Sequence, residues 1–320
     1  MTTASKLAAD VMSGYKITKQ EAEALFEIEA IALLAGADKI RERFKGKKVN
    51  LCSIINAKSG SCSENCAFCA QSISHKTKIE KYPLVDFKAI TEAVQTAVQN
   101  QAGCFGIVTS GNAVPESEID KICASVEENK KLGIKISASI GSADLDRLKK
   151  LKKAGLKRFH HNIETAESFF PNICTSHSYS DRISTAKAVK KAGLELCSGG
   201  IFGLGESRAQ RVEFAFAVKE LDADSVPLNF LNPIAGTPLA GQKPLSPEEI
   251  LKSIAVVRYI LPEKDINVCG GREVNLRDLQ SWIFFAGANG MMTGDYLTTS
   301  GRGTQQDLKM IKDLGFSVNK

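Results

Sequence analysis

The sequence predicts an α/β protein folded as a TIM-type (βα)8 barrel with an N-terminal helical extension. Short β-rich runs alternate with longer amphipathic segments, eight of each can be counted, and no low-complexity linker divides them. The 320 residues fit one such barrel, and a content of 43% hydrophobic against 24% charged residues allows a sizeable core. We therefore expect an extension over residues 1–40 and one barrel over residues 41–320.

The extension is predicted from its helical periodicity. Residues 17–37 form one acidic amphipathic pattern, with Thr18 as a suitable N-cap. The first twenty residues lack the apolar core of about 7–15 residues that a signal peptide needs. No apolar run approaches the ~18–20 residues that cross a bilayer. We expect a cytoplasmic protein with no membrane partner.

The barrel elements follow in order along the chain. Strands are expected at residues 49–56, 104–111, 135–141, 158–165, 195–202, 225–232, 266–271 and 290–294. Helices are expected near residues 86–100, 116–131, 144–154, 180–192, 207–221, 246–259, 275–285 and 304–313. Several of these helices are followed by a glycine typical of the C′ position, among them Gly133, Gly155 and Gly193. Chemistry is expected at the carboxyl ends of the strands, where barrel active sites lie.

Charge gives no sign of a nucleic-acid partner. The formal net charge is +6, but the basic residues are scattered over helix faces without interleaved aromatic residues. A solvated surface explains this distribution, so we expect no nucleic-acid binding.

Cysteine is the residue type that carries chemistry. Nine cysteines, an odd number in a reducing compartment, favour metal ligation or redox chemistry over a disulfide framework. Directly after the first predicted strand, Cys62, Cys66 and Cys69 have the spacing C-x3-C-x2-C. Three thiolates on one loop can each bind one iron of a cubane cluster, which leaves the fourth iron open to another ligand. The alternative is a zinc site completed by His75, which is less favoured because no second C-x2-C pair is present.

With Phe68 directly before its last cysteine, this motif resembles the radical S-adenosylmethionine superfamily. The segments HHNIET, CSGGIFGLGE, SVPLNFLNPIAGTPL, GGREVNL and GANGMMTGDYLTT resemble the biotin synthase family, from about residue 45 onward. The resemblance implies a [4Fe-4S] cluster and S-adenosylmethionine as cofactors. It also implies a sulfurtransferase that converts dethiobiotin to biotin through 5′-deoxyadenosyl radicals. Implied partners are a flavodoxin- or ferredoxin-type electron donor, the iron–sulfur assembly machinery and a second copy of the chain in a homodimer.

The resemblance also implies roles for individual residues. Cys62, Cys66 and Cys69 would hold the [4Fe-4S] cluster and, with Cys197, form the catalytic set. The contacts to S-adenosylmethionine would be Phe68 and Ile201 at the adenine, Asn162 and Glu164 at the ribose, and Arg182 near the methionine carboxylate. Asn229 and Asn162 would bind the ureido ring of dethiobiotin. The usual residue at position 164 is aspartate, and both carboxylates accept hydrogen bonds from ribose hydroxyls.

The sequence departs from the family at a second, auxiliary cluster. Family members hold a [2Fe-2S] cluster with three cysteines and an arginine, of which this chain keeps only Cys197. The other three positions are occupied by Gly106, Ser137 and Asn267, so that kind of site cannot form.

Other cysteines can replace the missing ligands. Residues two apart on a strand share a face, so Cys269 should face the lumen with residue 267, and Cys104 with residue 106. We expect a different auxiliary cluster, of the four-iron type, with ligands drawn from Cys197, Cys269, Cys174 and Cys104. The alternative is that buried cysteines pack as small hydrophobic residues, which is the interpretation preferred for Cys52 and Cys123.

Rival functions stay open at this point. One is another radical enzyme of the same branch, such as a hydrogenase-maturation protein or methylornithine synthase. Another is a non-catalytic iron–sulfur carrier, which would not need the adenosine-contact motifs. His160 and His161 are expected to be ordinary strand residues, since nothing near them in the sequence forms a nucleophile pair.

Overall fold

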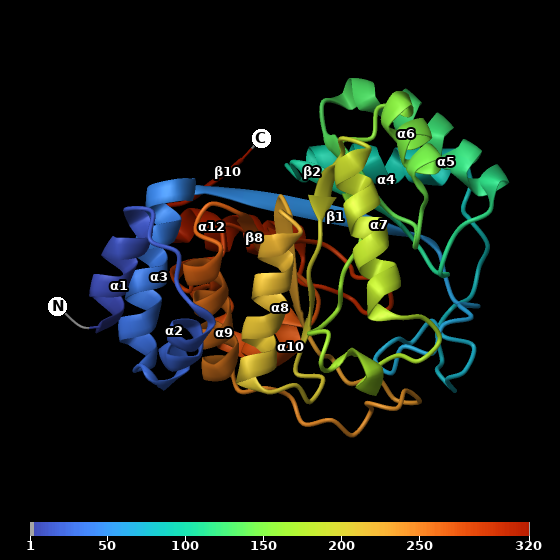
Figure 1. The fold of residues 1–320 in the computed structure, drawn as a ribbon. Coiled ribbons are helices and arrows are strands. Elements are labelled where there is room, and N and C mark those ends of the chain that lie inside the picture. The colour runs from blue at the N-terminus through green and yellow to red at the C-terminus, as the bar shows by residue number, and fades with distance from the viewer. Residues whose placement is uncertain (1–2, 320) are drawn as a thin grey trace.

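A closed barrel of parallel strands, surrounded by helices, forms the body of the protein (Figure 1). The computed structural model describes residues 3–319. In order round the barrel the strands are β1 (Lys48–Lys58), β2 (Cys104–Thr109), β3 (Lys135–Ser139), β4 (Arg158–His160), β5 (Glu195–Cys197), β7 (Ser225–Phe230), β8 (Asp265–Val268) and β9 (Gly290–Met292). Strand β9 pairs with β1 and closes the barrel, which confirms the predicted fold class.

The fifth predicted strand, expected to be continuous over residues 195–202, is interrupted. Strand β5 ends at Cys197, and the chain resumes pairing in β6 (Gly200–Phe202), beside β7. A Cβ atom at Gly199 would lie 1.9 Å from the carbonyl oxygen of Pro227, so only glycine allows this close approach to β7. The interruption turns the N–H of Gly199 toward the side chain of Asn162, where it donates a hydrogen bond.

Seven helices of ten or more residues cover the described part of the barrel. They are α4 (Phe87–Gln99), α5 (Glu116–Asn129), α6 (Leu145–Ala154), α7 (Tyr179–Lys191), α8 (Arg208–Glu220), α9 (Pro247–Ile260) and α12 (Thr304–Asp313). Gly133, Gly155 and Gly193 all have positive φ, as their C′ positions predict. The prediction of a single helix near residues 275–285 is wrong. Two short helices, α10 (Arg272–Leu276) and α11 (Trp282–Phe285), lie in this region. They are separate because Arg277 adopts φ 51° and ends α10.

The N-terminal segment consists of α1 (Thr3–Met12), α2 (Lys19–Ala24) and α3 (Ala30–Lys45). Thr18 caps α2 in a capping box with Glu21, as its predicted N-cap role requires. The continuous helix expected over residues 17–37 is wrong. The chain is extended at Ile28, and the Glu29 carboxylate then accepts two backbone N–H bonds and starts α3.

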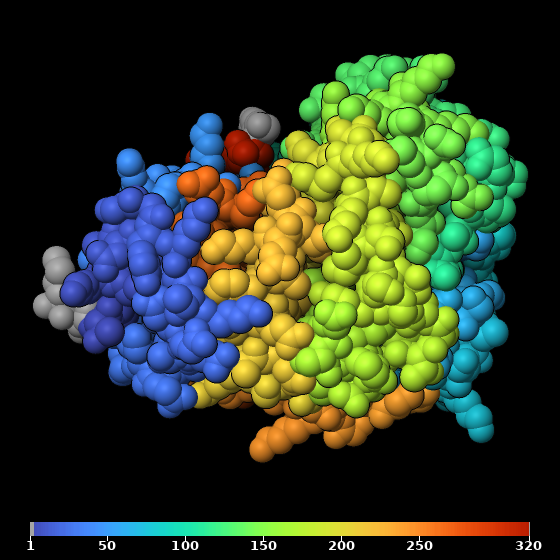
Figure 2. All heavy atoms as spheres, in the orientation of Figure 1, coloured from blue at the N-terminus to red at the C-terminus, as the bar shows by residue number. Residues whose placement is uncertain are grey.

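This segment packs on one side of the barrel. Helix α2 contacts α8 and α3 contacts α9, so the segment, blue in Figure 2, lies against the yellow and orange helices. Helix α3 continues to Lys45, beyond residue 40, where the extension was expected to end. Residues 1 and 2 of the expected extension lie outside the described range. Strand β10 (Ser317–Val318) pairs with β1 outside the barrel. In residues 3–319 we find no helix with the length and apolar character to cross a membrane.

Candidate active site

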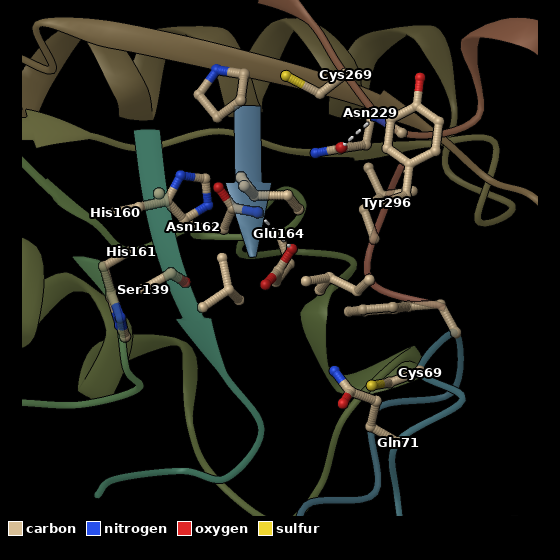
Figure 3. A pocket seen from close by; sticks show the side chains of 18 of the residues that line it. Cys69, Gln71, Ser139, His160, His161, Asn162, Glu164, Asn229, Cys269 and Tyr296 are labelled. Carbon is tan, nitrogen blue, oxygen red and sulfur yellow. Dashed lines mark hydrogen bonds between the residues drawn. The ribbon is translucent and has the colours of Figure 1, made fainter. Parts of the chain in front are cut away.

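A cavity of about 430 Å³ fills the barrel lumen and extends to the loops after the carboxyl ends of the strands. Its lining includes every site residue expected from the sequence except Cys174. In Figure 3, Cys69 and Cys269 lie at opposite ends of this cavity, with Asn162, Glu164 and Asn229 between them. We call the Cys69 end the mouth and the Cys269 end the inner end.

The mouth is built by the loop that follows β1 and carries Cys62, Cys66 and Cys69. Backbone hydrogen bonds fold the loop back on itself: the N–H of Cys62 donates to Gln71 at 3.1 Å and that of Cys69 donates to Cys66 at 2.9 Å. Ala67 donates to the carbonyl of Ile173 at 2.8 Å and fixes the loop against the segment after β4. The three thiols therefore reach the cavity from a loop whose backbone is held on both sides.

The spacing of these thiols favours a cluster over a single ion. In the described chain only one group of three metal-binding side chains has donor atoms within 4.8 Å of one another, and it is not Cys62, Cys66 and Cys69. One zinc ion needs such close packing of its ligands, whereas cubane ligands bind separate irons. His75 is not part of that close group either. Burial raises the pKa of Cys69 to about 11, so a metal must displace its proton.

Beside the mouth, Glu164 and Arg182 place opposite charges on the cavity wall. Glu164 adopts φ 67°, and its carbonyl accepts a 2.8 Å hydrogen bond from the N–H of Ile201. Arg182 donates to the carbonyl of Asn162 at 3.0 Å and lies 3.4 Å from the Glu164 carboxylate. A Cβ atom at Gly200 would lie 2.2 Å from the Glu164 carbonyl oxygen, so this approach requires glycine. The site can thus offer a carboxylate to hydroxyls and a guanidinium to an anion.

Asn162 and Asn229 are held in place but not fully satisfied. The Asn162 side chain donates to Glu164 at 3.2 Å and accepts from Gly199 at 3.1 Å. Asn229 donates to the carbonyl of Gly200 at 3.1 Å and accepts from the N–H of Gly270 at 2.9 Å. A primary amide has two N–H donors, so each asparagine keeps one N–H for a ligand.

Four cysteines line the inner end of the lumen. Cys104, Cys197 and Cys269 are buried there, and strand parity predicts this position for Cys104 and Cys269. The fourth is Cys52, which was expected to be a packing residue. It lines the cavity and pairs in register with Cys104 on β2. The neighbouring Cys52 thiol and the Arg158 guanidinium lower the pKa of Cys104, against the effect of burial. Because Cys52 and Cys104 are register partners on neighbouring parallel strands, a side chain that faces the lumen at Cys104 implies the same for Cys52.

The positions that lack the usual auxiliary ligands also face the lumen. A Cβ atom at Gly106 would lie 3.0 Å from Cγ2 of Ile54 and 3.3 Å from Oγ of Ser137, so a larger side chain would be crowded. Asn267 donates to Oγ of Ser225 at 2.8 Å.

Arg158, a buried cation on β4, lines the same cavity and was not among the site residues expected from the sequence. Burial opposes its charge, but the thiols of Cys197, Cys104 and Cys52 raise its pKa. The guanidinium also forms an ion pair with Glu195, with Nη2 2.8 Å from the carboxylate. The inner end therefore contains a buried arginine on β4, whereas residue 267 on β8, where the family resemblance implies an arginine, is asparagine.

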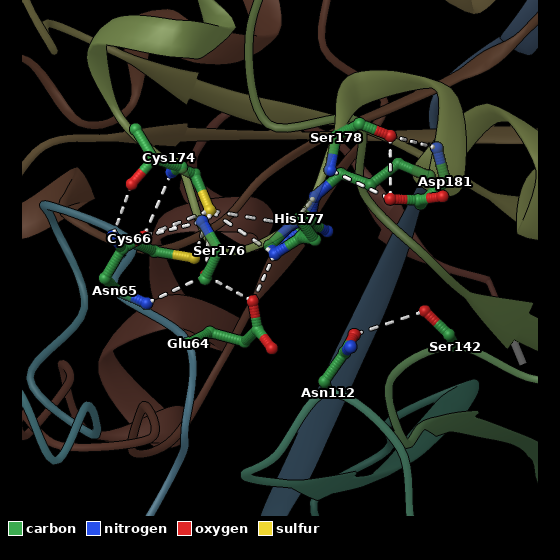
Figure 4. Close-up of polar contacts among 12 residues, drawn as sticks. Glu64, Asn65, Cys66, Asn112, Ser142, Cys174, Ser176, His177, Ser178 and Asp181 are labelled. Atoms are coloured by element: carbon green, nitrogen blue, oxygen red, sulfur yellow. Dashed lines mark hydrogen bonds and ion pairs between the residues drawn. The ribbon is translucent and has the colours of Figure 1, made fainter.

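Cys174 lies elsewhere. Its Sγ is 3.7 Å from Sγ of Cys66 and 3.3 Å from Nδ1 of His177, in the segment after β4 (Figure 4). The expectation that Cys174 joins Cys197 and Cys269 is corrected by this position. The segment that carries it is hydrogen-bonded to the mouth loop, and Cys174 itself does not line the cavity.

Comparisons with known proteins agree with this geometry. The Radical SAM superfamily model matches residues 58–218, and the Biotin and Thiamin Synthesis associated domain model matches residues 227–317. The chain is 53% identical to the biotin synthase of Endomicrobium trichonymphae, covering 98% of this chain and 97% of the relative. It is 52% identical to the biotin synthase of Geobacter sulfurreducens, again over 98% and 97%.

Solved structures of other enzymes share the fold. Methylornithine synthase has a TM-score of 0.86 at 21% identity, covering 98% of this chain and 97% of that one. The FeFe-hydrogenase maturase HydG from Carboxydothermus hydrogenoformans has a TM-score of 0.84 at 16% identity, covering 99% and 79%. At such identities the likeness shows the fold alone. The proteins with the rival functions therefore have the same kind of barrel, but their sequences are far less similar to this chain than those of the biotin synthases. The chain belongs to the biotin synthase family of radical S-adenosylmethionine enzymes.

Proposed function

We propose that this chain converts dethiobiotin to biotin, with the inserted sulfur supplied by an auxiliary iron–sulfur cluster at the inner end. The observation that carries the proposal is a single cavity that joins a three-cysteine loop to four inner cysteines, with two half-satisfied asparagines between them. A reaction that breaks C–H bonds at one end and adds sulfur from the other needs this arrangement. A simple iron–sulfur carrier does not.

Cys62, Cys66 and Cys69 would hold the [4Fe-4S] cluster at the mouth. When bound and reduced, the cluster would supply one electron to S-adenosylmethionine, whose C–S bond would break to give methionine and a 5′-deoxyadenosyl radical able to abstract hydrogen from unactivated carbon. Glu164 accepts hydrogen bonds from the ribose hydroxyls, and Arg182 faces the methionine carboxylate. Ile201 and the backbone at Phe68 contact the adenine. These residues fix the position of the cofactor before the reaction starts.

Asn162 and Asn229 position the substrate. Each donates its remaining N–H to the ureido group of dethiobiotin, because the other polar atoms of both amides already have protein partners. Asn162 also touches Glu164, so one side chain links the ribose site to the substrate site. The enclosed lumen excludes water from the reacting carbons.

The auxiliary cluster would be held by the four inner cysteines, Cys197, Cys269, Cys104 and Cys52. Cys52 takes the place of Cys174, which does not line the cavity. Four thiolates suit a four-iron cluster, which would supply the sulfur that bridges the two carbons. Arg158 would act as a positioning residue, since its buried guanidinium offsets the negative charge of the thiolates. The carboxylate of Glu195 holds that guanidinium in place.

The test is an anaerobic reaction of reconstituted protein with S-adenosylmethionine, dithionite and dethiobiotin, followed by mass spectrometry. The proposal predicts both 5′-deoxyadenosine and biotin, and neither product from Cys62→Ala. Deoxyadenosine without biotin would overturn the substrate assignment while leaving the radical chemistry in place.

The cellular setting completes the proposal. The reductant would be a flavodoxin- or ferredoxin-type protein, the clusters would come from the iron–sulfur assembly machinery, and the chain would act as a cytoplasmic homodimer. Family membership supports these features. Purified flavodoxin with its reductase should replace dithionite in the same assay, and sedimentation should give twice the chain mass of 34.5 kDa.

A further inference from the structure

Three metal-binding side chains converge behind the mouth loop: Cys66, Cys174 and His177. The two sulfurs are 3.7 Å apart, and Sγ of Cys174 is 3.3 Å from Nδ1 of His177. Both cysteines are buried, and the histidine is partly buried. Across residues 3–319 no other three such side chains bring their donor atoms within 4.8 Å of one another.

The distances fit one zinc ion. With Zn–S bonds of about 2.3 Å and Zn–N bonds of about 2.0–2.1 Å, a tetrahedral site separates two sulfurs by about 3.8 Å and a sulfur from a nitrogen by about 3.6 Å. The observed separations of 3.7 and 3.3 Å lie close to these values. Two thiolates and an imidazole are also the soft and borderline ligands that zinc prefers.

The backbone holds this arrangement without an ion. The side-chain carbonyl of Asn65 accepts hydrogen bonds from the N–H groups of Thr175 at 3.0 Å and Ser176 at 3.2 Å. Ala67 donates to Ile173 at 2.8 Å, so these three hydrogen bonds join the loop of Cys66 to the segment of Cys174. The site is built by packing between two segments more than one hundred residues apart.

The hydrogen bonds of His177 determine which protons must move before a metal ion can bind. Arg182 Nε lies 2.9 Å from Nε2 of His177 and can only donate, so Nδ1 carries the proton and donates it to Glu64. A metal at Nδ1 moves this proton to Nε2, and Arg182 must then release His177. The two thiols lose their protons to solvent. Glu64, already in contact with Nδ1, or a water molecule can fill the fourth position.

We propose that the cluster-free protein binds one Zn²⁺ ion through Cys66, Cys174 and His177. Because Cys66 is also a cluster ligand in the proposed function, the zinc form and the [4Fe-4S] form exclude each other. Zinc therefore shields the thiol of Cys66 and must leave before the cluster is assembled. Zinc binding itself involves neither S-adenosylmethionine nor dethiobiotin, so it can fail or succeed independently of the proposed function.

The first test measures zinc affinity in full-length, cluster-free protein under anaerobic conditions, by competition with a chromophoric chelator. All variants carry Cys52→Ser, Cys104→Ser, Cys197→Ser and Cys269→Ser, which removes the four inner thiols as a second zinc site. We expect one tightly bound zinc per chain, and at least about 100-fold weaker binding after Cys174→Ala. The matched control, Cys123→Ala on α5, should leave the affinity unchanged. Equal affinity with and without Cys174 would overturn the proposal.

The second test locates the ion and guards against misfolding. Alkylation of the same protein, followed by peptide mapping, should show that zinc slows the modification of Cys66 and Cys174 together. Protection of Cys62 and Cys69 instead would place the ion in the cluster loop and contradict the assignment. Zinc should also delay [4Fe-4S] reconstitution, read at its visible absorption, and Cys174→Ala should remove that delay while its circular dichroism stays the same.

Discussion

The mouth and the inner end of the cavity both present cysteines, but they are built in different ways. At the mouth, Cys62, Cys66 and Cys69 come from one loop of eight residues. At the inner end, the cysteines come from three strands and one strand end: Cys52 from β1, Cys104 from β2, Cys197 from β5, and Cys269 from the position directly after β8. Cysteines that share one loop can be predicted to lie together from their spacing in the sequence. Cysteines on separate strands can be predicted to lie together only if the register of the strands and the direction of each side chain are known. The comparison also predicts that each end can be disabled without the other.

The largest expected effect is the loss of the mouth cluster. Cys62→Ala should reduce 5′-deoxyadenosine formation at least about 100-fold, because the change removes a metal ligand outright. Auxiliary iron and sulfide should remain, since no inner cysteine is changed. Iron analysis and product quantification by mass spectrometry check both statements. Cys123→Ala is the control, and normal deoxyadenosine formation by Cys62→Ala would contradict the assignment of the mouth.

The converse experiment changes the inner end. Cys269→Ala should lower biotin formation at least about 100-fold and reduce bound iron and sulfide, again through loss of a ligand. Cleavage of S-adenosylmethionine should persist, because the mouth is intact. Unchanged iron content in this variant would remove Cys269 from the auxiliary site.

A smaller effect is expected at the cofactor wall between the two ends. Glu164→Gln should raise the KM for S-adenosylmethionine about 10- to 100-fold, since hydrogen bonds to a charged group contribute roughly 1.5–3 kcal/mol. Glu164→Asp keeps the carboxylate, and aspartate tolerates positive φ better, so it should restore much of the affinity. Steady-state kinetics distinguish the two variants. Equal losses in both would argue against a carboxylate contact.

At the substrate, Asn229→Ala should raise the KM for dethiobiotin about 3- to 10-fold, the equivalent of one neutral hydrogen bond. The KM for S-adenosylmethionine should stay the same, because Asn229 contacts Gly200 and Gly270 and not the ribose site. A parallel rise in both KM values would indicate general damage to the lumen.

The smallest effect concerns pH and global stability. Burial lowers the pKa of His161 to about 3, so the folded protein keeps this imidazole neutral while the unfolded chain protonates it near pH 6.5. Its contribution to stability is therefore complete above that pH and declines by about 1.4 kcal/mol per unit as pH falls further. Urea unfolding at pH 7.5 and 5.0 measures the decline, and His161→Gln should reduce it. An unchanged slope in His161→Gln would show that other groups, such as His160, dominate.

Most of the barrel could be predicted because strand and helix periods are local properties of the chain. The errors fall where tertiary contacts override the local pattern: at Gly199, which approaches β7, at Arg277, which breaks a helix, and at Glu29, which starts one. Spacing alone predicted the mouth. Parity placed Cys104 and Cys269 in the lumen correctly, because it needs only one reference residue on each strand.

The neighbours of two site residues could not be predicted from the sequence. Those of Cys52 required the register between β1 and β2. Cys174 was expected in the loop after the fourth strand, but its contact with Cys66 required the path by which that segment folds back onto the mouth loop. Arg158 was missed because it belongs to no spaced motif in the sequence. Only the closed barrel places it beside three thiols.

The central claim is that the inner cysteines hold the sulfur source and the mouth holds the radical source. The most direct test reconstitutes wild-type and Cys269→Ala protein with ³⁴S-sulfide, removes free sulfide, and supplies S-adenosylmethionine, dithionite and dethiobiotin in one turnover. We predict ³⁴S-labelled biotin from the wild type and none from the variant, although both form 5′-deoxyadenosine. Unlabelled biotin from the wild type, or labelled biotin from Cys269→Ala, would contradict the account.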